Sequence, residues 1–539
     1  MPVKIRKIAA LVLAAAAALL FPACNGNAPR NAGKKISYHL DADPVTLDPQ
    51  IAADTPSLVA IRSLYEGLTR LDASGNAKPG VAKTWDANAD GTQFTFHLRA
   101  DAKWSAKKYG SVTAEDFVFA FRRALDPKTG SATCQQMYCI RNARKIHAGA
   151  LSPDSLGVSA KDAKTLVVDL EYSFPDFPKL ASAAVFMPCD ETFFRETAGR
   201  YGLETEDILG NGPFVIDGAY GWEHGKRLSL AGSGSYAGEQ AALPSAVSFA
   251  IGGEGFDAAA ALKEGTVDAA PVSAAQLDEV KALGCTTVSF EDTTWGLCFN
   301  TQSALFKNVK VRTAFAQALD RSAVLSHIPE NASAAENILL PQTELNGRPY
   351  RTPAGGPFYL KQSGNAAQTL AAGLSELHLE NMAPVAVLCP DSANAKLMVN
   401  EMIAAWNKQF NDYFNMEPLA ESDLESRVAS GDYGLAVCSI RPADSGPLAA
   451  LSLFTSASGD NPAHLRDPSY DALVAAAEAK SGNETAAACA AAEKYLNERA
   501  VFYPLCYEKS YYAAAKGVTG IVFLPFQNGI DFIGAGKES

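Results

Sequence analysis

Apolar and polar residues alternate in two N-terminal segments and predict strands there. In the segment 92–99, Phe94, Phe96 and Leu98 fall on one side and polar residues on the other. A period of two is typical of a strand with one buried face. The segment 35–40 is interpreted as a second, shorter strand. We therefore expect the chain to enter its folded part through a strand.

Three further segments have helical spacing. The segment 57–67 should form a helix that Gly67 ends, because glycine adopts the left-handed conformation at low cost. A second helix should open at Thr113 with Asp116 completing a capping box, and Asp126-Pro127 should stop it. The third helix, near residue 310, carries a stripe that must pack on a core. This stripe consists of Val311, Ala314, Phe315 and Ala318.

Later segments are less regular. The stretch 331–373 is rich in Ala, Gly and Pro and is interpreted as loop, whereas the Ala-rich stretch 471–498 is interpreted as a helix hairpin. No repeat of fixed period is found.

The N-terminal apolar run predicts export. Basic residues at positions 4, 6 and 7 precede an apolar stretch, 8–21, of about 14 residues, which is shorter than the roughly 20 that a membrane-spanning helix needs. This pattern is typical of a signal peptide, here residues 1–23, that is removed from the mature protein. A polar tether, 24–35, follows.

Cys24 ends the signal-like stretch, and the pattern around it resembles a bacterial lipoprotein signal, with Phe21 where the usual motif has Leu. Acyl chains on Cys24 would anchor the protein to a membrane, because each buried methylene contributes about 0.8 kcal/mol. A plain signal peptide, or a buried Cys24, is the alternative.

The remaining chain, of about 515 residues, is longer than one hydrophobic core usually organises, which suggests two or three domains. The net charge of −12 is spread along the sequence without a basic run. That distribution argues against binding to nucleic acid. No nucleic-acid partner is expected.

Several motifs, in this order and spacing, resemble the family 5 extracellular solute-binding proteins, which include oligopeptide- and dipeptide-binding proteins of ABC transporters. The motifs are Leu47-Asp48-Pro49, Leu64-Tyr65-Glu66-Gly67-Leu68, Pro79-Gly80-Val81-Ala82, Val112-Thr113-Ala114-Glu115-Asp116, Gly210-Asn211-Gly212-Pro213-Phe214, Phe299-Asn300-Thr301, Ala318-Leu319-Asp320-Arg321 and Tyr503-Pro504-Leu505. Together they cover nearly the whole mature chain.

The resemblance implies an α/β fold of the periplasmic-binding-protein type, with two lobes that close on a cleft and an additional inserted domain. The implied division is domain I at 36–66, 188–291 and 502–539, domain II at 67–187, and domain III at 292–501. The implied function is capture of oligopeptides outside the cytoplasmic membrane and delivery to an ABC permease. A monomer without cofactor is expected.

The resemblance also implies binding residues. Asp444 is the candidate for holding the peptide's α-ammonium, because a carboxylate in a drier cleft makes a strong charge-assisted bond. Its alternative interpretation is an ordinary turn residue before Ser445-Gly446. Ile440 and Arg441 lie on the same run, where Arg441 replaces the Trp that the family usually has.

Two further places are implied as ligand contacts. Asp54 and Thr55 would form one edge for the peptide backbone, by strand addition. Trp295 and Leu297 lie near where the family lines its cleft, and a buried core Trp is an equal alternative.

Enzyme and metal sites find little support. Ser105-Ala106-Lys107-Lys108 matches a motif of penicillin-recognising enzymes only formally, because its setting is wrong. The histidines are scattered, no cysteine belongs to a C-x-x-C pair, and no cysteine has a His three or four residues away, so a zinc site is not expected. With Cys24 lipidated nine cysteines remain; bridges between Cys134 and Cys139, or between Cys298 and Cys438, are the pairings considered.

Other functions stay open. The same fold could bind a nickel complex, haem, an opine or an oligosaccharide, or the chain could be a surface receptor or adhesin without a transporter.

Overall fold

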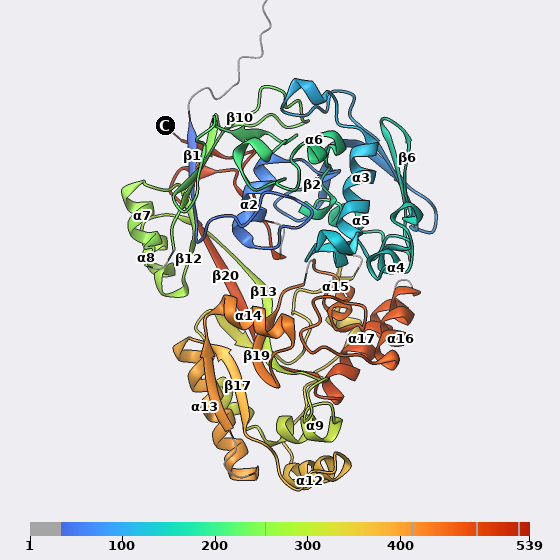
Figure 1. Cartoon of the computed structure of the whole chain (residues 1–539). Coiled ribbons are helices and arrows are strands. Elements are labelled where there is room, and N and C mark those ends of the chain that lie inside the picture. Colours follow the sequence, from blue (N-terminus) through green and yellow to red (C-terminus); the bar gives the residue numbers. More distant parts are fainter. Residues whose placement is uncertain are drawn as a thin grey trace, which may run out of the picture.

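Two long strands, β13 (Thr286–Phe299) and β20 (Phe502–Ala514), pair antiparallel along nearly their whole length and connect two lobes (Figure 1). The structure is a computed structural model that describes residues 34–253, 255–345, 347–410, 414–442, 444–480, 483–526 and 529–538. We call the part built from residues 34–285 and 515–538 the first lobe, and the part built from residues 300–500 the second lobe. Each lobe has its own hydrophobic cores.

One mixed sheet of 12 strands runs through both lobes of the described chain. Its order is β18 (Phe414–Leu419), β17 (Val385–Pro390), β19 (Leu435–Ile440), β13, β20, β12 (Ala269–Val272), β1 (Lys35–Leu40), β11 (Ala246–Ile251), β10 (Arg227–Gly232) and β8 (Phe214–Ile216), with β14 (Ala332–Ala334) beside β20 and β9 (Trp222–Glu223) beside β10. β1 pairs parallel with β11 and β12, and β17 pairs parallel with β18 and β19. The mixture of parallel and antiparallel strands confirms the predicted α/β class.

A second sheet of four strands belongs to the first lobe. Its order is β4 (Ala82–Ala87), β5 (Gln93–Leu98), β7 (Thr165–Asp169) and β6 (Val158–Asp162). Small pairs are formed by β2 (Thr69–Leu71) with β3 (Ala77–Pro79), β15 (Glu344–Leu345) with β16 (Arg348–Pro349), β21 (Val518–Thr519) with β24 (Gly536–Lys537), and β22 (Val522–Phe523) with β23 (Ile530–Asp531).

The helices lie around these sheets (Figure 1). In the first lobe they are α2 (Thr55–Leu64), α3 (Ala114–Leu125), α4 (Ala143–His147), α5 (Phe177–Leu180), α6 (Glu191–Glu196), α7 (Ala258–Glu264) and α8 (Leu277–Ala282). In the second lobe they are α9 (Val309–Ala318), α10 (Arg321–Leu325), α11 (Arg351–Ala354), α12 (Ala366–Glu376), α13 (Ala393–Phe410), α14 (Glu421–Ser430), α15 (Pro447–Leu451), α16 (Pro468–Glu478) and α17 (Asn483–Glu498).

Local sequence explains several element boundaries. α3 begins after Thr113, whose capping box with Asp116 satisfies backbone donors at the helix start, as predicted. α2 begins at Thr55, two residues earlier than predicted, because the Asp54 side chain accepts from the Ser57 N–H at 2.9 Å. It ends at Leu64, three residues earlier than expected, because Tyr65 is already extended.

Alternation along β13 separates two cores of the second lobe. Leu297 and Phe299 enter one core, whereas Cys298 between them enters the other. The predicted stripe of α9 is buried as expected, and α16 with α17 forms the predicted helix hairpin.

Motif residues near the N-terminus hold the first lobe together. Asp48 receives two hydrogen bonds from the Arg123 guanidinium, at 2.7 and 2.5 Å. Glu66 pairs with Arg99 at 2.6 Å and is almost fully buried. Buried charges of this kind must be paired, so these residues have a structural role.

None of the described helices is long and apolar enough to cross a membrane. The division into three domains stays a prediction, and its boundary at residue 291 falls on a register shift of β13 between Glu291 and Thr293.

Candidate ligand-binding cleft

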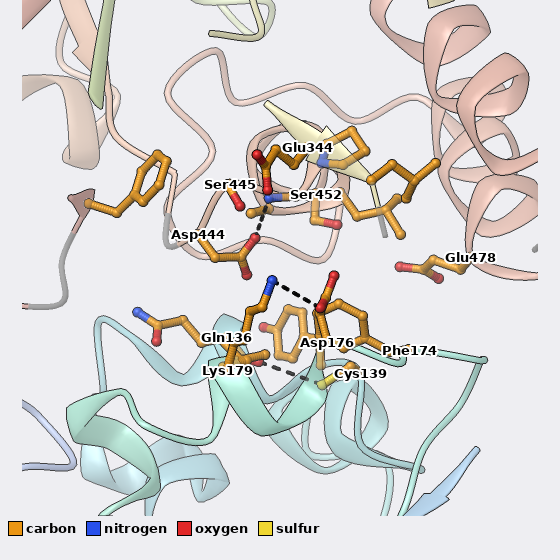
Figure 2. A pocket seen from close by; sticks show the side chains of 18 of the residues that line it. Gln136, Cys139, Phe174, Asp176, Lys179, Glu344, Asp444, Ser445, Ser452 and Glu478 are labelled. Carbon is orange, nitrogen blue, oxygen red and sulfur yellow. Dashed lines mark hydrogen bonds and ion pairs between the residues drawn. The ribbon is translucent and has the colours of Figure 1, made fainter. Parts of the chain in front are cut away.

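A cavity of about 270 Å³ lies between the lobes. Its first wall comes from the α4 and α5 region of the first lobe, and its second wall from the α15 and α16 region of the second lobe (Figures 1 and 2). Charged residues of both walls line it: Arg144, Asp176, Lys179, Glu344, Arg441, Asp444, Glu478 and Lys480. Apolar and aromatic residues fill the space between them, among them Tyr172, Phe174, Leu448 and Phe526.

Asp444 lies in the second wall, between the end of β19 and the start of α15. One carboxylate oxygen accepts from the Gly446 N–H at 2.6 Å, and the side chain points into the cavity in Figure 2. Burial raises the pKa of Asp444 to about 6, with a smaller rise from the negative charge of Asp176. A cation from a ligand would favour the ionised form again.

Asp176 and Lys179 face Asp444 from the first wall (Figure 2). They form an ion pair at 3.2 Å, and about a third of each side chain is exposed. The positive charge of Lys179 acts on Asp444 in the direction opposite to Asp176 and lowers its pKa. The two walls are therefore electrostatically coupled across the cavity.

The lobes also touch beside this cavity. Arg144 of α4 pairs with Glu478 of α16, and Gln135 donates to the Asp460 carboxylate. Burial raises the pKa of Glu478 while Arg144 lowers it. These contacts hold the two walls against each other in the arrangement observed.

A second and larger cavity, of about 820 Å³, lies where β13 and β20 leave the first lobe. Its lining includes Thr55, Asp292, Arg441, Tyr511 and Tyr512. Burial raises the pKa of Asp292, and the nearby Arg441 charge lowers it. Leu524, Phe526 and Arg441 line both cavities, which are thus neighbouring parts of one cleft.

Arg441 connects the two cavities from the second lobe. Its guanidinium donates to the Glu421 carboxylate at 3.2 Å, and both side chains are about half exposed. Exposed ion pairs of this kind contribute little stability, so Arg441 is available to a ligand. Ile440, its neighbour, is buried in a core of the second lobe and pairs with Thr294 on β13.

The residues expected at a backbone edge separate in the structure. Thr55 is exposed and lines the second cavity. The Asp54 side chain caps α2 and is not among the residues that line either described cavity. The backbone around these residues stays a candidate edge, but the Asp54 carboxylate has a structural task.

Trp295 and Leu297 lie on β13, away from the lining of both described cavities. The Trp295 indole N–H donates to the Glu508 carboxylate, which lines the second cavity. Leu297 is fully buried in a core. Trp295 can therefore orient a cavity residue, whereas the Leu297 side chain packs between β13 and the helices.

Sequence reasoning missed Asp176, Lys179 and Asp292. Asp176 follows Pro175 in a loop and carries no motif, so only the fold, which brings residues 176 and 444 to one cavity, identifies it. Asp292 begins the predicted domain III and could have been noticed as a charged residue inside an otherwise strand-like segment.

The nine cysteines within the described residues are all free, including both pairs considered for bridges. Within the same residues, no group of three or more His, Cys, Asp or Glu could hold a metal ion. Cys24 lies outside the described residues.

Comparison with known proteins shows which proteins the chain is similar to. The sequence profile described as "Bacterial extracellular solute-binding proteins, family 5 Middle" matches residues 76–462. Dipeptide-binding protein DppE of Bacillus subtilis is 24% identical over 504 residues, which cover 92% of this chain and 91% of the relative. Oligopeptide-binding protein OppA of the same organism is 26% identical, covering 82% of this chain and 83% of the relative.

A solved structure has the same fold. The substrate-binding domain of an oligopeptide ABC transporter from Bacillus anthracis superposes with a TM-score of 0.79 at 24% identity, covering 94% of this chain and 100% of that chain.

Proposed function

Because the chain belongs to the bacterial extracellular solute-binding proteins of family 5, we propose that it captures oligopeptides in the cleft between its lobes and delivers them to an ABC import permease. Its curated relatives include dipeptide- and oligopeptide-binding proteins that align over most of the chain. The protein acts by binding and release, as a transport component outside the cytoplasm.

The position of the Asp444 side chain is the observation that carries the proposal. Its carboxylate points into a cavity between the lobes, where burial raises its pKa to about 6. The α-ammonium of a peptide would stabilise the ionised form of Asp444 through a charge-assisted hydrogen bond. A neutral sugar would leave this carboxylate without a matching charge.

The second cavity supplies room for the rest of the peptide. It is about 820 Å³ in volume, and it adjoins the first cavity at Arg441. A peptide whose amine lies on Asp444 would extend past Arg441 toward Thr55. Binding through the backbone and the terminal charges leaves the side chains free to vary, which suits a transporter of many peptides.

The lipid anchor is part of the proposal. A short apolar run ends at Cys24, and the tether that follows it would give the folded part some distance from the membrane. A lipidated Cys24 would keep a monomeric binding protein near its permease.

Ligand carried through purification is the direct test. Mass spectrometry of the denatured protein should find short peptides, and added peptides should raise the melting temperature of ligand-free protein. Stabilisation by nickel, haem, opines or oligosaccharides, with no response to a panel of peptides, would replace the peptide proposal with a different solute. A surface receptor without a transporter would be indicated if the protein bound peptides but supported no uptake by cells.

A further inference from the structure

In one part of the first cavity, a carboxylate from each wall faces the other. Asp444 comes from the second lobe, and Asp176 comes from the segment just before α5 in the first lobe. Figure 2 shows the two side chains on opposite sides of the cavity, with the Lys179 ammonium reaching up between them. Their charges interact, since Asp176 is one of the groups that act on Asp444.

The Asp176 side chain has no structural task that would explain its position. It makes no capping hydrogen bond to α5; at the start of this short helix it is the backbone carbonyl of Asp176 that accepts, from the N–H groups of Lys179 and Leu180. The ion pair that its carboxylate makes, with Lys179 at 3.2 Å, joins two residues of the same turn. A pair that is about one-third exposed contributes little to folding.

Lys179 therefore places a cation of the protein between two carboxylates of opposite lobes. With Asp176 and Asp444 both ionised, the three groups carry one net negative charge. This net negative charge favours a cationic ligand at this place over a neutral one.

We propose that Asp176 is a second, cross-lobe partner of the ligand's α-ammonium, and that Lys179 fills this place until a ligand arrives. This inference rests on the proposed function, because it assigns residues to the same amine site. On binding, the ligand ammonium takes a position between Asp444 and Asp176, and the Lys179 ammonium moves aside toward solvent.

Two consequences follow from this arrangement. Like charges on opposite lobes repel each other, and a cation between them replaces that repulsion with attraction to both lobes. Binding of an amine is then coupled to closure, because the ligand contacts a charge on each wall. Lys179 competes with the ligand for this place, so an amine that binds only weakly does not displace the Lys179 ammonium.

The test uses matched peptides with free or acetylated N-termini and isothermal titration calorimetry on the full mature protein. Asp176→Asn should weaken binding of the free-amine peptide by about 10-fold or more, while binding of the acetylated peptide changes little. Lys179→Met should act in the opposite direction and strengthen binding of the free-amine peptide by a factor of about 3 to 10. Asp278→Asn, at a fully exposed position of α8, is the charge-matched control and should bind as the parent does.

The outcomes separate this inference from the proposed function. If the parent binds free and acetylated peptides equally, the amine site as a whole is wrong. If the parent prefers the free amine and Asp176→Asn keeps that preference in full, only the cross-lobe role of Asp176 is overturned. The same holds for Lys179 if Lys179→Met binds the free-amine peptide no more tightly than the parent.

Small-angle X-ray scattering gives a readout that a merely structural role would not change. Free-amine peptide should compact the parent more than it compacts Asp176→Asn at equal saturation. Equal compaction would contradict the coupling of this carboxylate to closure.

Discussion

Asp444→Asn removes one negative charge from the cleft and preserves the shape of the side chain. The amide oxygen of the substituted side chain can still accept from the Gly446 N–H, to which the Asp444 carboxylate is bonded at 2.6 Å. The loop before α15 should therefore keep its conformation. The variant tests charge recognition separately from folding.

The expected loss follows from the surroundings of Asp444. Truncating one partner of a buried charge pair costs about 2 to 5 kcal/mol. Asp444 is only partly buried by exposed area, and Asp176 would still attract the ammonium, so we take the lower part of this range. A loss of about 2 to 3 kcal/mol corresponds to roughly 30- to 150-fold weaker binding.

The pH dependence supplies a second signature. The pKa of Asp444 is about 6 in the ligand-free folded protein, against 3.8 ordinarily. Between pH 3.8 and about pH 6 the folded protein therefore keeps a proton on Asp444 that the unfolded chain has lost. The contribution of Asp444 to the free energy of unfolding is therefore fully present below about pH 4, and it is lost as the pH rises through about 6. Amine binding needs the ionised form, so affinity should fall below pH 6 by at most about tenfold per pH unit.

Calorimetry with free and N-acetylated peptides, between about pH 4.5 and 7.5 so as to bracket the pKa of Asp444, measures both effects. Asp444→Asn should greatly reduce the difference between the two peptides and flatten the acid limb of the affinity profile. Asp278→Asn, which also removes one negative charge but from a fully exposed position, should have neither effect. The reasoning is refuted if Asp444→Asn keeps the full preference for free amines, because Asp444 would then be an ordinary turn residue.

Three further predictions concern the rest of the molecule. Cys24→Ser should move the protein from the detergent phase to the aqueous phase in phase partitioning, and identical partitioning of parent and variant would contradict the anchor. A shortened protein that starts near residue 31 should show no hydrolase activity. Its stability, measured by thermal unfolding, should rise by about 2.7 kcal/mol at a peptide concentration of about 100 times Kd. No gain with any peptide would contradict peptide capture. Arg144→Gln leaves Glu478 without its cross-lobe partner and should destabilise the arrangement in which the lobes touch by about 1 to 3 kcal/mol. Small-angle X-ray scattering should then give a larger radius of gyration for the ligand-free protein. Unchanged scattering would show that this pair does not hold the lobes together.

Sequence periodicity predicted several local elements because their causes are local. The interpretation of 331–373 as loop was wrong in part, because this stretch contains β14, β15, β16, α11 and the start of α12. β1 has the predicted bounds, Lys35–Leu40, and α3 opens at its capping box. The start of α2 was placed two residues late because the hydrophobic stripe begins after its polar first turn. The Asp54 cap that sets this start was assigned to ligand instead.

The site was predictable only in part, because its walls come from distant segments. Asp444 was identified through its place in a family pattern, and the structure places its side chain in the cleft. Leu297 was expected at the ligand, but alternation along β13 turns it into a core. Asp176 has no sequence signal at all, since its significance arises only when α5 faces α15 across the cavity.

This dependence on folding also suggests how the protein can release what it binds. Neither lobe alone offers more than half of the proposed amine site: Asp444 belongs to one lobe and Asp176 to the other. The lobes are connected by β13 and β20, and the register of β13 against β20 is interrupted between Glu291 and Thr293, near the second cavity. A bend at this irregular point would separate the two carboxylates without breaking either core. The ligand would then lose one of its two charge partners, and its affinity would fall before any contact in the second cavity changed.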